Sequence, residues 1–270
     1  YRGLDLGTSK PSPADRARVR HHLIDVVDLA SGFDAAQFVR MATEAVADIR
    51  SRGRIPIFCG GTGLYFKALF DGLDETPHTD PQLRAELENT PLPALLDELA
   101  ARDRDTFERI DRLNPRRVVR ALEVLRLTGR PLSVQRADWR PGNAPASAAA
   151  PPVVVFTRSP DDLRARIDAR TDAMFRAGLV DETRRLLTAG LGANRTALQA
   201  IGYRQVVEHL RGERDLTDTI ALVKQKTWQY AKRQLTWFRH QLNGRWLELK
   251  PTDAPAEVCF RLHVDSPALE

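Results

Sequence analysis

The sequence predicts an α/β fold in which a parallel sheet forms the core and an all-helical segment is inserted into it. Short apolar runs at residues 22–27 and 54–59 flank a helical pattern, and another apolar run begins at residue 153. A strand, a helix and a second strand within about 35 residues are typical of a parallel βαβ unit. Residues 71–139 show helical patterns without strands, so we expect them to form the insertion.

The same patterns set the expected domain boundaries. We expect the core to comprise residues 1–75 and 150–270, and the helical insertion to comprise residues 76–140. Residues 141–152 form the stretch PGNAPASAAAPP, and such proline- and alanine-rich sequence favours an exposed connection between the two.

The first part of the core is expected to contain one short helix and one βαβ unit. Apolar residues recur at helical spacing from Phe38 to Ile49, with Ser31 or Asp34 as the N-cap and Gly53 at the end. The expected elements are a helix over residues 13–19, a strand over 22–27, a helix from about 34 to 52 and a strand over 54–59.

Three helices are expected in the insertion, each opened by a proline, because proline is tolerated in the first helical turn. They begin near Asp80, Pro93 and Asn114, and Val118 and Leu122 lie on the buried stripe of the third. In the second part of the core we expect a strand over 153–156, helices over 160–176, 179–189, 203–211 and 216–241, and a strand over 246–249.

The composition of the 270 residues excludes several classes of protein. Hydrophobic residues make up 42% and charged residues 29%, which excludes a disordered or fibrous chain. No stretch approaches the roughly 18 uninterrupted apolar residues of a membrane helix, so we expect no membrane association. Cys59 and Cys259 cannot form a disulfide framework and favour a cytoplasmic protein with reduced thiols. The histidines and cysteines lack metal-ligand spacing, so no protein metal site is predicted.

A glycine-rich loop, Gly60-Gly61-Thr62-Gly63, follows an apolar run and precedes a helical pattern. Glycine lets the backbone approach a ligand closely, and the free N–H groups of a following helix would attract an anion. The Thr62 hydroxyl could donate to a phosphate or to a reacting group. A tight turn without a ligand is the alternative, and the loop lacks the GxxxxGK[ST] spacing of a Walker A motif.

Residues 219–247 contain no Asp or Glu, although the whole chain carries 36 acidic against 41 basic residues and a net charge of only +5. A helix of one charge sign with interleaved aromatic residues is typical of binding to a phosphate backbone. The alternative is a solvated basic face whose aromatic residues lie in the core. The basic residues of this stretch are Lys224, Lys226, Lys232, Arg233, Arg239 and Arg245.

Arginines also gather around the start of the helix expected from Asn114. Cations at a helix N-terminus oppose the helix dipole, which favours an anionic ligand there. A surface face with Glu123 and Asp111 as ionic partners is the alternative. The cluster consists of Arg112, Arg116, Arg117 and Arg120.

Six segments resemble, in the same order and at similar spacing, the bacterial tRNA dimethylallyltransferase family, also called tRNA isopentenyltransferases. They extend over nearly the whole chain: YRGLDLGTSKPS (1–12), HHLID (21–25), GGTGLY (60–65), NPRRVVRALEV (114–124), IGYRQ (201–205) and KRQLTWFR (232–239). Each motif is weak alone, and six in order are specific.

The resemblance implies transfer of a dimethylallyl group from dimethylallyl diphosphate to N6 of the adenosine at tRNA position 37, beside the anticodon, with Mg²⁺ assisting the diphosphate. It also implies a P-loop-kinase-like core and an insertion that grips the anticodon stem-loop. We therefore expect tRNA, dimethylallyl diphosphate and Mg²⁺ as partners, and a monomer without an obligate protein partner.

The resemblance also implies roles for individual residues. Thr62 is implied at the reacting centre, and Gly60, Gly61 and Arg204 are implied at the diphosphate. The residues implied to contact tRNA are Arg84, Arg116, Arg117, Val118, Val119, Arg120, Gln199, Ala200, Ile201, Gly202, Tyr203, Arg204, Lys232, Arg233, Gln234, Leu235, Thr236, Trp237, Phe238 and Arg239.

The chain departs from the family at its start. The family begins with a diphosphate-binding GPTxSGKT loop and carries its general-base aspartate in a D-S-x-Q-V-Y motif that ends at what is Tyr1 here. Asp5 is not that aspartate, because it belongs to the GLDLGT segment that follows. We therefore expect about 35 residues to precede Tyr1, and we expect the chain without them to be inactive or nearly so.

Three other functions stay open. An adenylate isopentenyltransferase would modify free AMP or ADP, but it would need neither the helical insertion nor the acid-free helix. A small-molecule or nucleotide kinase could share the core. A non-catalytic remnant would bind tRNA without transferring the prenyl group.

Overall fold

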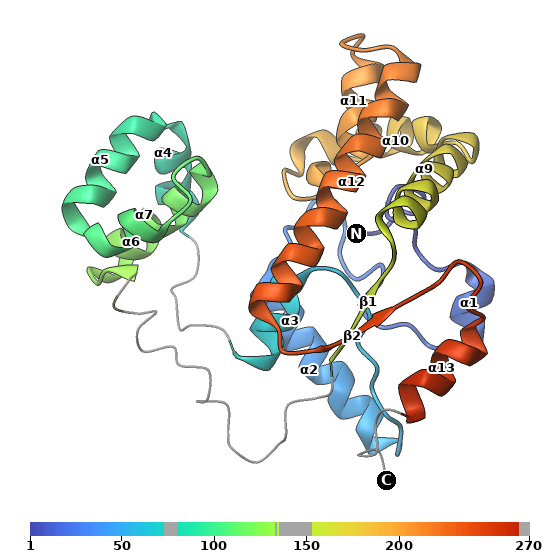
Figure 1. Cartoon of the computed structure of the whole chain (residues 1–270). Helices are drawn as coiled ribbons and strands as arrows, with labels where there is room; N and C mark the ends of the chain where they lie inside the picture. Colours follow the sequence, from blue (N-terminus) through green and yellow to red (C-terminus); the bar gives the residue numbers. More distant parts are fainter. Residues whose placement is uncertain (73–79, 133, 135–152, 265–270) are drawn as a thin grey trace. The chain divides into compact units, whose positions relative to one another are not determined.

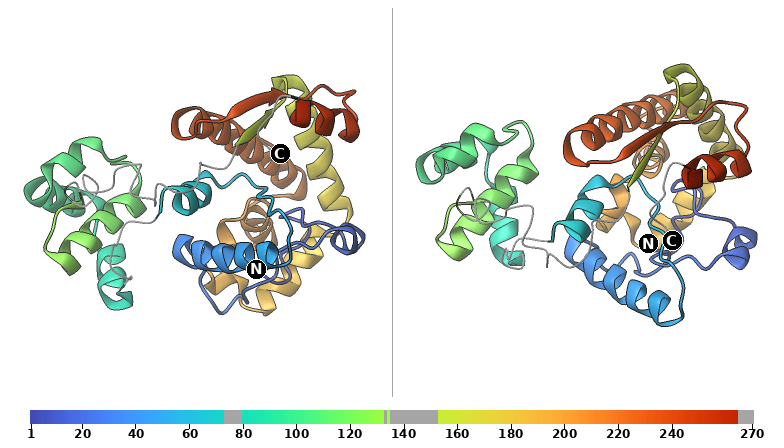
Figure 2. Two further views of the ribbon diagram at one scale, coloured as in Figure 1. Left: turned by 90° about the horizontal axis from the view of Figure 1, so that it is seen from below. Right: turned by 60° about the horizontal axis from the view of Figure 1, so that its bottom comes forward.

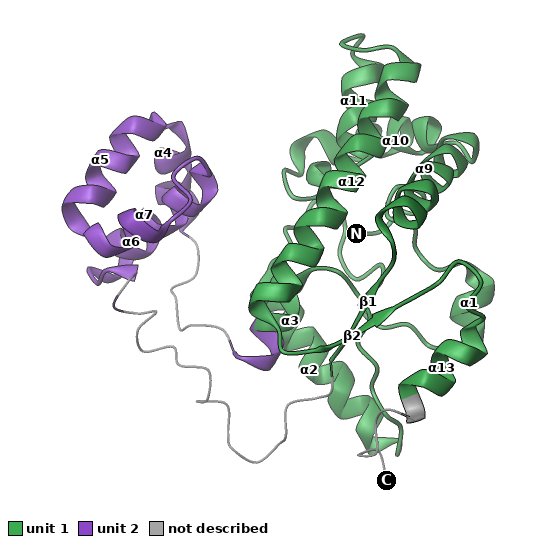
Figure 3. Cartoon of the chain, viewed as in Figure 1, with its two compact units in different colours: residues 1–67, 151–270 green, residues 68–150 purple. Residues whose placement is uncertain are grey.

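The computed structural model describes residues 1–72, 80–132, 134 and 153–264. The chain divides into two compact units, residues 1–67 with 151–270 (unit 1) and residues 68–150 (unit 2), shown in Figure 3. The division falls after residues 67 and 150, where the sequence predicts boundaries at 75 and 150. The expected connection at 141–152 lies outside the described residues.

Unit 1 contains a two-stranded parallel sheet. Strands β1 (Val154–Thr157) and β2 (Arg245–Glu248) pair in register from Val154 with Arg245 to Thr157 with Glu248. Helices lie between the two strands in the sequence, as a parallel connection requires, and Figure 1 shows their arrangement. They are α9 (Pro160–Arg176), α10 (Leu179–Thr188), α11 (Tyr203–Leu210) and α12 (Leu216–Gln241). The α/β class and these two strands are therefore confirmed.

The second half of unit 1 also provides its main core. Leu179, Leu191 and Val206 are fully buried there, and Leu4 from the N-terminal loop packs among them. Helix α9 packs along α12, which Figure 2 shows from two further sides. Helix α13 (Pro255–Val264) follows β2 and was not predicted. The core thus ties the start of the chain to helices nearly 200 residues later.

The two strands predicted in the first part of the core are wrong. Residues 22–27 and 54–59 form no strand, although α1 (Pro13–Arg18) and α2 (Ala35–Ser51, with Asp34 as N-cap) confirm the helices around them. Leu23 has a φ of 60°, outside the β region. Ile55 and Ile57 are 79% and 83% exposed, because no described segment pairs with their backbone. An apolar run becomes a strand only where a partner strand accepts its hydrogen bonds.

Within its described residues, unit 2 contains helices and no strand. Its core forms around α7 (Pro115–Thr128), where Val118, Ala121, Leu122 and Leu125 are buried, and Gly129 ends the helix with a φ of 66°. Asn114 occupies the N-cap position, but its side chain makes no capping hydrogen bond. The other helices are α4 (Pro81–Asn89), α5 (Leu92–Arg102) and α6 (Arg104–Arg109), of which α6 was not predicted. The helical insertion is therefore confirmed.

Candidate functional site

The glycine-rich loop lies directly against α12. The side-chain amide of Gln234 donates to the Gly61 carbonyl at 2.7 Å. A Cβ added to Gly61 would stand 2.0 Å from that amide nitrogen, and one added to Gly63 would stand 2.1 Å from the Trp237 ring. Only glycine allows this close approach. The structure therefore brings together two sequence motifs that lie more than 170 residues apart.

Thr62 lies between the two close contacts, and its side chain is exposed. It precedes α3 (Gly63–Phe70), and its carbonyl accepts the Tyr65 N–H at 2.9 Å. The Tyr65 ring stacks on Phe38 of α2, with 4.6 Å between the centroids, and its half-buried position raises the pKa of Tyr65. Lys67 donates to Gln241 of α12 at 2.9 Å. These contacts anchor the backbone of Thr62 and the helix that follows it.

Beside this loop, α12 carries an open hollow of about 450 Å³. Gln229, Lys232, Arg233, Thr236 and Trp237 line it. The two cations and Thr236 are exposed, while Trp237 is half-buried. The hollow therefore combines an apolar wall with positive charge.

Aromatic rings, and not carboxylates, accompany two cations at this end of α12, Lys232 in the hollow and Arg239 beyond it. Lys232 Nζ lies 5.6 Å from the centroid of Trp228, and the Arg239 guanidinium lies 5.4 Å from that of Trp246. Among the described residues neither cation has an ion pair with a carboxylate. Because a ring attracts a cation without cancelling its charge, this end of α12 keeps its positive potential.

The remaining residues predicted on α12 lie in two different environments. Gln234, Leu235, Trp237 and Phe238 are half-buried, so they support the loop and the helix. Lys224, in the first half of the acid-free stretch, pairs with Asp172 at 2.7 Å. Lys226 is exposed like Lys232, Arg233 and Arg239, so Lys224 is the cation of α12 that a carboxylate accompanies among the described residues.

In unit 2 the arginines implied to contact tRNA lie on α4 and α7. Arg116 and Arg117 are exposed in its first turn. Arg120 donates to Glu123 at 2.6 Å, and Arg84 of α4 donates to the same carboxylate at 3.2 Å. The alternative that assigned Glu123 as an ionic partner of this cluster is thus correct for Arg120.

Four residues implied to contact tRNA are buried, and this corrects their predicted role. Val118 and Val119 are 0% and 3% exposed in the core of unit 2, as the helical periodicity predicts for Val118. Gly202 and Tyr203 are buried in unit 1, and a φ of 103° at Gly202 explains the glycine. A motif match does not separate residues that face a ligand from residues that support them.

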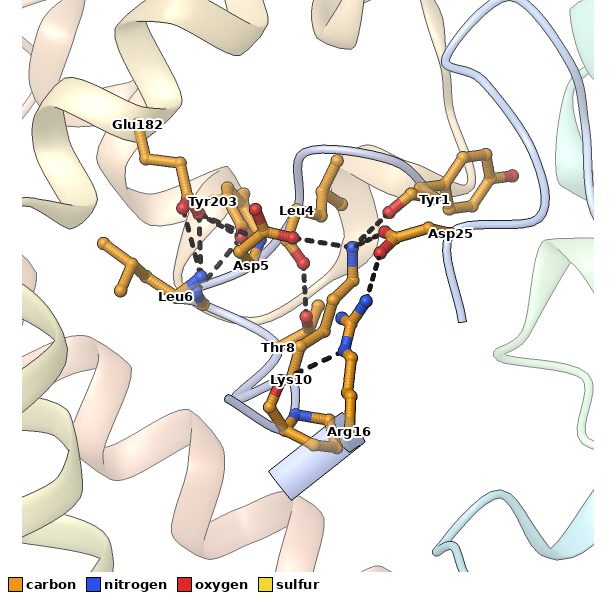
Figure 4. A network of polar contacts seen from close by, with 12 residues as sticks. Tyr1, Leu4, Asp5, Leu6, Thr8, Lys10, Arg16, Asp25, Glu182 and Tyr203 are labelled. Carbon is orange, nitrogen blue, oxygen red and sulfur yellow. Dashed lines mark hydrogen bonds and ion pairs between the residues drawn. The ribbon is translucent and has the colours of Figure 1, made fainter. Parts of the chain in front are cut away.

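Tyr203 instead belongs to a polar network that joins the N-terminal loop to α10 and α11 (Figure 4). Its hydroxyl donates to the buried Glu182 carboxylate and accepts the Gly7 N–H at 3.1 Å. Glu182 also accepts the N–H groups of Asp5 and Leu6 at 3.2 and 3.0 Å. Burial and the bond to Glu182 raise the pKa of Tyr203 far above its ordinary value. Sequence reasoning missed Glu182, because no local pattern links it to the loop.

A second part of this network holds the loop from the other side. Lys10 donates to the Tyr1 carbonyl at 2.6 Å, to Asp5 at 2.8 Å and to Asp25, which also accepts from Arg16 at 2.8 Å. The hydrogen bond from Lys10 holds the pKa of Asp25 below its ordinary value. Sequence reasoning assigns no role to these residues, although the segments 1–12 and 21–25 are two of the six that carry the family resemblance.

The segment around residue 201 does not join the glycine-rich loop through any described contact. Gln199 is exposed and donates to the Arg195 carbonyl at 2.7 Å. Ala200 and Ile201 are half-buried. Arg204 is exposed and pairs with Glu208 at 3.1 Å. A contact of Arg204 with the diphosphate therefore stays a prediction.

Within the described ranges, no group of three or more His, Cys, Asp or Glu side chains could hold a metal ion. The described helices also include none that is long and apolar enough to cross a membrane.

In comparisons with known proteins, the chain is similar to prenyl-transferring enzymes. Residues 1–241 match the family model described as IPP transferase. A tRNA dimethylallyltransferase of Halorhodospira halophila is 47% identical over 252 residues, which cover 90% of this chain and 80% of that protein. The tRNA dimethylallyltransferase 1 of Citrifermentans bemidjiense is 43% identical over 248 residues, covering 92% and 80% of the two chains.

The fold agrees with a solved structure of the same kind. The full-length tRNA isopentenylpyrophosphate transferase of Bacillus halodurans is 33% identical, with a TM-score of 0.68, over 98% of this chain and 84% of that one. The expectation that the chain lacks a diphosphate loop and a general base is not borne out by the comparisons.

Proposed function

The chain belongs to the IPP transferase family, and we propose that it transfers a dimethylallyl group from dimethylallyl diphosphate to N6 of the adenosine at position 37 of tRNA. The single observation that carries this proposal is the contact of the glycine-rich loop with the acid-free end of α12. Through this contact the exposed Thr62 hydroxyl lies near the part of α12 that carries Lys232, Arg233 and Trp237. The cations would favour RNA phosphates, and the Trp237 ring would favour an apolar group.

The proposed reaction needs the base outside the stacked anticodon loop. Turning a base out costs a few kcal/mol (about 2–4), which contacts to the flanking nucleotides must offset. N6 then forms a bond to C1 of the dimethylallyl group while the C1–O bond breaks. The diphosphate leaves with the electron pair of that bond, and N6 releases a proton to a general base. Recognition would depend on the single-stranded loop, because side chains cannot read the deep, narrow major groove of an RNA duplex.

Each part of the site has a proposed role in this reaction. Thr62 would donate its hydroxyl hydrogen bond at the reacting centre, and the N–H groups of Gly60 and Gly61 would face the departing diphosphate. Lys232, Arg233 and Arg239 would bind RNA phosphates along α12. The Trp237 wall of the hollow would shield the prenyl group from water.

Mg²⁺ is proposed only as a companion of the diphosphate. Magnesium is bound through carboxylates and substrate phosphates, and the described residues contain no carboxylate cluster at the glycine-rich loop. The residues present therefore form no protein site for the ion, and the roles above do not involve it.

We further propose that the protein works in the cytoplasm as a monomer. Cys59 and Cys259 are both free and exposed, which suits a reducing compartment. The two described hydrophobic cores each lie within one unit of one chain. Neither core needs a second copy to be complete.

The proposal is tested by offering radiolabelled dimethylallyl diphosphate together with either unmodified tRNA or AMP. We expect label in tRNA only, at the N6 of one adenosine, as nuclease digestion of the product would show. Label in AMP without label in tRNA would identify an adenylate isopentenyltransferase. Tight tRNA binding without transfer would identify a non-catalytic tRNA-binding protein.

A further inference from the structure

In unit 2 the buried carboxylate of Glu123 joins α7 to α4, because it accepts hydrogen bonds from an arginine of each helix. The Glu123 side chain is 0% exposed, although α7 otherwise buries apolar residues along this face. Its Oε2 atom accepts from Arg120 at 2.6 Å and from Arg84 at 3.2 Å. Among the described residues its Oε1 atom has no hydrogen-bond partner. The carboxylate is therefore committed to the two arginines.

The negative charge of Glu123 destabilises the fold at this buried position unless its partners compensate. A buried carboxylate loses its hydration, and only close, charge-assisted hydrogen bonds offset that loss. A leucine in place of Glu123 would fill the same core at lower cost. Glu123 therefore contributes more to the orientation of Arg84 and Arg120 than to the stability of the core.

The geometry fixes the two guanidinium groups side by side. Both distances are measured to the same oxygen, so the two cations lie close together despite their mutual repulsion. Their side chains are still 25% and 33% exposed, so a ligand can reach both. Arg84 also donates from Nε to Glu88 at 3.0 Å. This second hydrogen bond further restricts the orientation of its guanidinium group.

We propose that Glu123 is a positioning residue that presents Arg84 and Arg120 together to one phosphodiester of the bound tRNA. The inference rests on the proposed function, since it takes tRNA as the ligand. Two partly exposed guanidinium groups held in a fixed orientation match the geometry of a phosphate. Because Glu88 and Glu123 balance their charges, the pair contributes orientation more than attraction.

The test is the tRNA affinity of Glu123→Gln, and its sign is informative. The substitution makes the protein more positive, so charge alone predicts tighter binding of a polyanion. Loss of positioning predicts the opposite: a Kd for tRNA about 5–10 times higher and a shallower salt dependence, by about one phosphate contact. In the transfer reaction KM for tRNA should rise while kcat stays within about twofold.

Glu98→Gln is the matched control. Glu98 also accepts from two arginines of unit 2, Arg126 at 2.7 Å and Arg102 at 3.0 Å, and none of these residues belongs to the proposed tRNA surface. Its tRNA affinity should stay equal to or slightly above that of the wild type. A similar loss in both variants would assign Glu123 a merely structural role and overturn the proposal.

A second set of variants keeps the proposal testable if Glu123→Gln does not fold, which circular dichroism would show. Arg84→Gln and Arg120→Gln alter partly exposed side chains. If both bind one phosphate, the double variant should lose less affinity than the two single losses combined, as a double-mutant cycle measures. Fully additive losses would overturn the shared contact. Absence of tRNA binding by the wild type would instead contradict the proposed function, so the two failures are distinguishable.

Discussion

Two basic regions of the molecule differ in what accompanies their charges. On α12 the cations Lys232 and Arg239 lie over aromatic rings. Around α7 the guanidinium groups of Arg84 and Arg120 are bonded to a buried carboxylate. A ring leaves the charge of its cation intact, whereas a carboxylate cancels it and fixes its direction. The first region is thus built for attraction, and the second for orientation.

The difference teaches that residue type alone does not define a nucleic-acid surface. Both regions are rich in basic residues and both match motifs of the family. The free energy that each contributes depends on its partners, because net charge sets the salt-dependent part of binding and fixed donors set its geometry. We expect the variants below to separate chemistry, attraction and orientation.

The largest effect is expected where α12 meets the glycine-rich loop. Thr62→Ala removes the exposed hydroxyl and leaves the loop contacts intact. Loss of one donor at a reacting centre costs about 100-fold or more in kcat, while the Kd for tRNA should not change. Single-turnover transfer and tRNA binding would be measured in parallel, with Thr62→Ser as the variant that should recover most activity. Equal loss of binding and rate would place Thr62 in tRNA binding and not in chemistry.

A somewhat smaller effect is expected from closing the gap between the loop and the helix. Gly63→Ala adds a methyl group that would meet the Trp237 ring, so the loop must move away from α12. Overpacking of this kind costs about 1–3 kcal/mol of unfolding free energy, and transfer activity should fall with it. Gly32→Ala is the control, since its added Cβ would meet nothing within 4 Å. Urea unfolding of both variants measures the difference, and equal stability would contradict the tight contact.

The contrast between ring-paired and carboxylate-paired cations can be tested directly. Lys232→Ala removes an uncancelled charge and should raise the Kd for tRNA about 5–10-fold and lower the salt slope by about one. Arg239→Ala should act in the same direction. Arg102→Ala removes a cation that is paired with Glu98 in unit 2, and should leave the slope unchanged. Identical salt slopes of tRNA binding in all three variants would show that this end of α12 is an ordinary solvated face.

The smallest effect is expected on the unfolding free energy in acid, and only for cations that are paired with carboxylates. Hydrogen bonds from Arg126 hold the pKa of Glu98 below its ordinary value of 4.5. A carboxylate with a lowered pKa stabilises the fold above its ordinary pKa, and this contribution is lost as pH falls through the lower folded value. For a partly exposed pair the loss is about 0.5–1 kcal/mol.

Urea unfolding of the wild type and of Glu98→Gln, at about pH 6 and pH 3, would measure this loss. We expect the difference in unfolding free energy between the two proteins to shrink at the lower pH. A difference independent of pH would show that the Glu98 charge contributes nothing to stability.

Much of the fold follows from local patterns in the sequence. The helices around Phe38 and Val118 and the strands at 154–157 and 245–248 lie where the periodicity predicts them. The apolar runs at 22–27 and 54–59 failed as strands, since a run of apolar residues cannot reveal whether a partner strand is present. The helices α6 and α13 escaped prediction.

The candidate site was predictable only in part. Thr62, Lys232 and Arg239 carry their signal in the motif itself, and the structure leaves all three exposed. Tyr203 shares a motif with Arg204, yet one is buried and the other lies in solvent. Neighbouring residues on a helix face different directions, and the motif does not record which direction faces the ligand.

The sequence by itself determined the family, the α/β class, the helical insertion and the uneven distribution of positive charge, because motifs, periodicity and charge are properties of residue order. Only the tertiary structure decided which of those charges are cancelled, by bringing Arg84 to Glu123 and Lys224 to Asp172. It alone placed Gly63 against Trp237 and Glu182 against the N-terminal loop. These contacts join residues that lie far apart in the chain, so their energies depend on distance in space and not on position in the sequence.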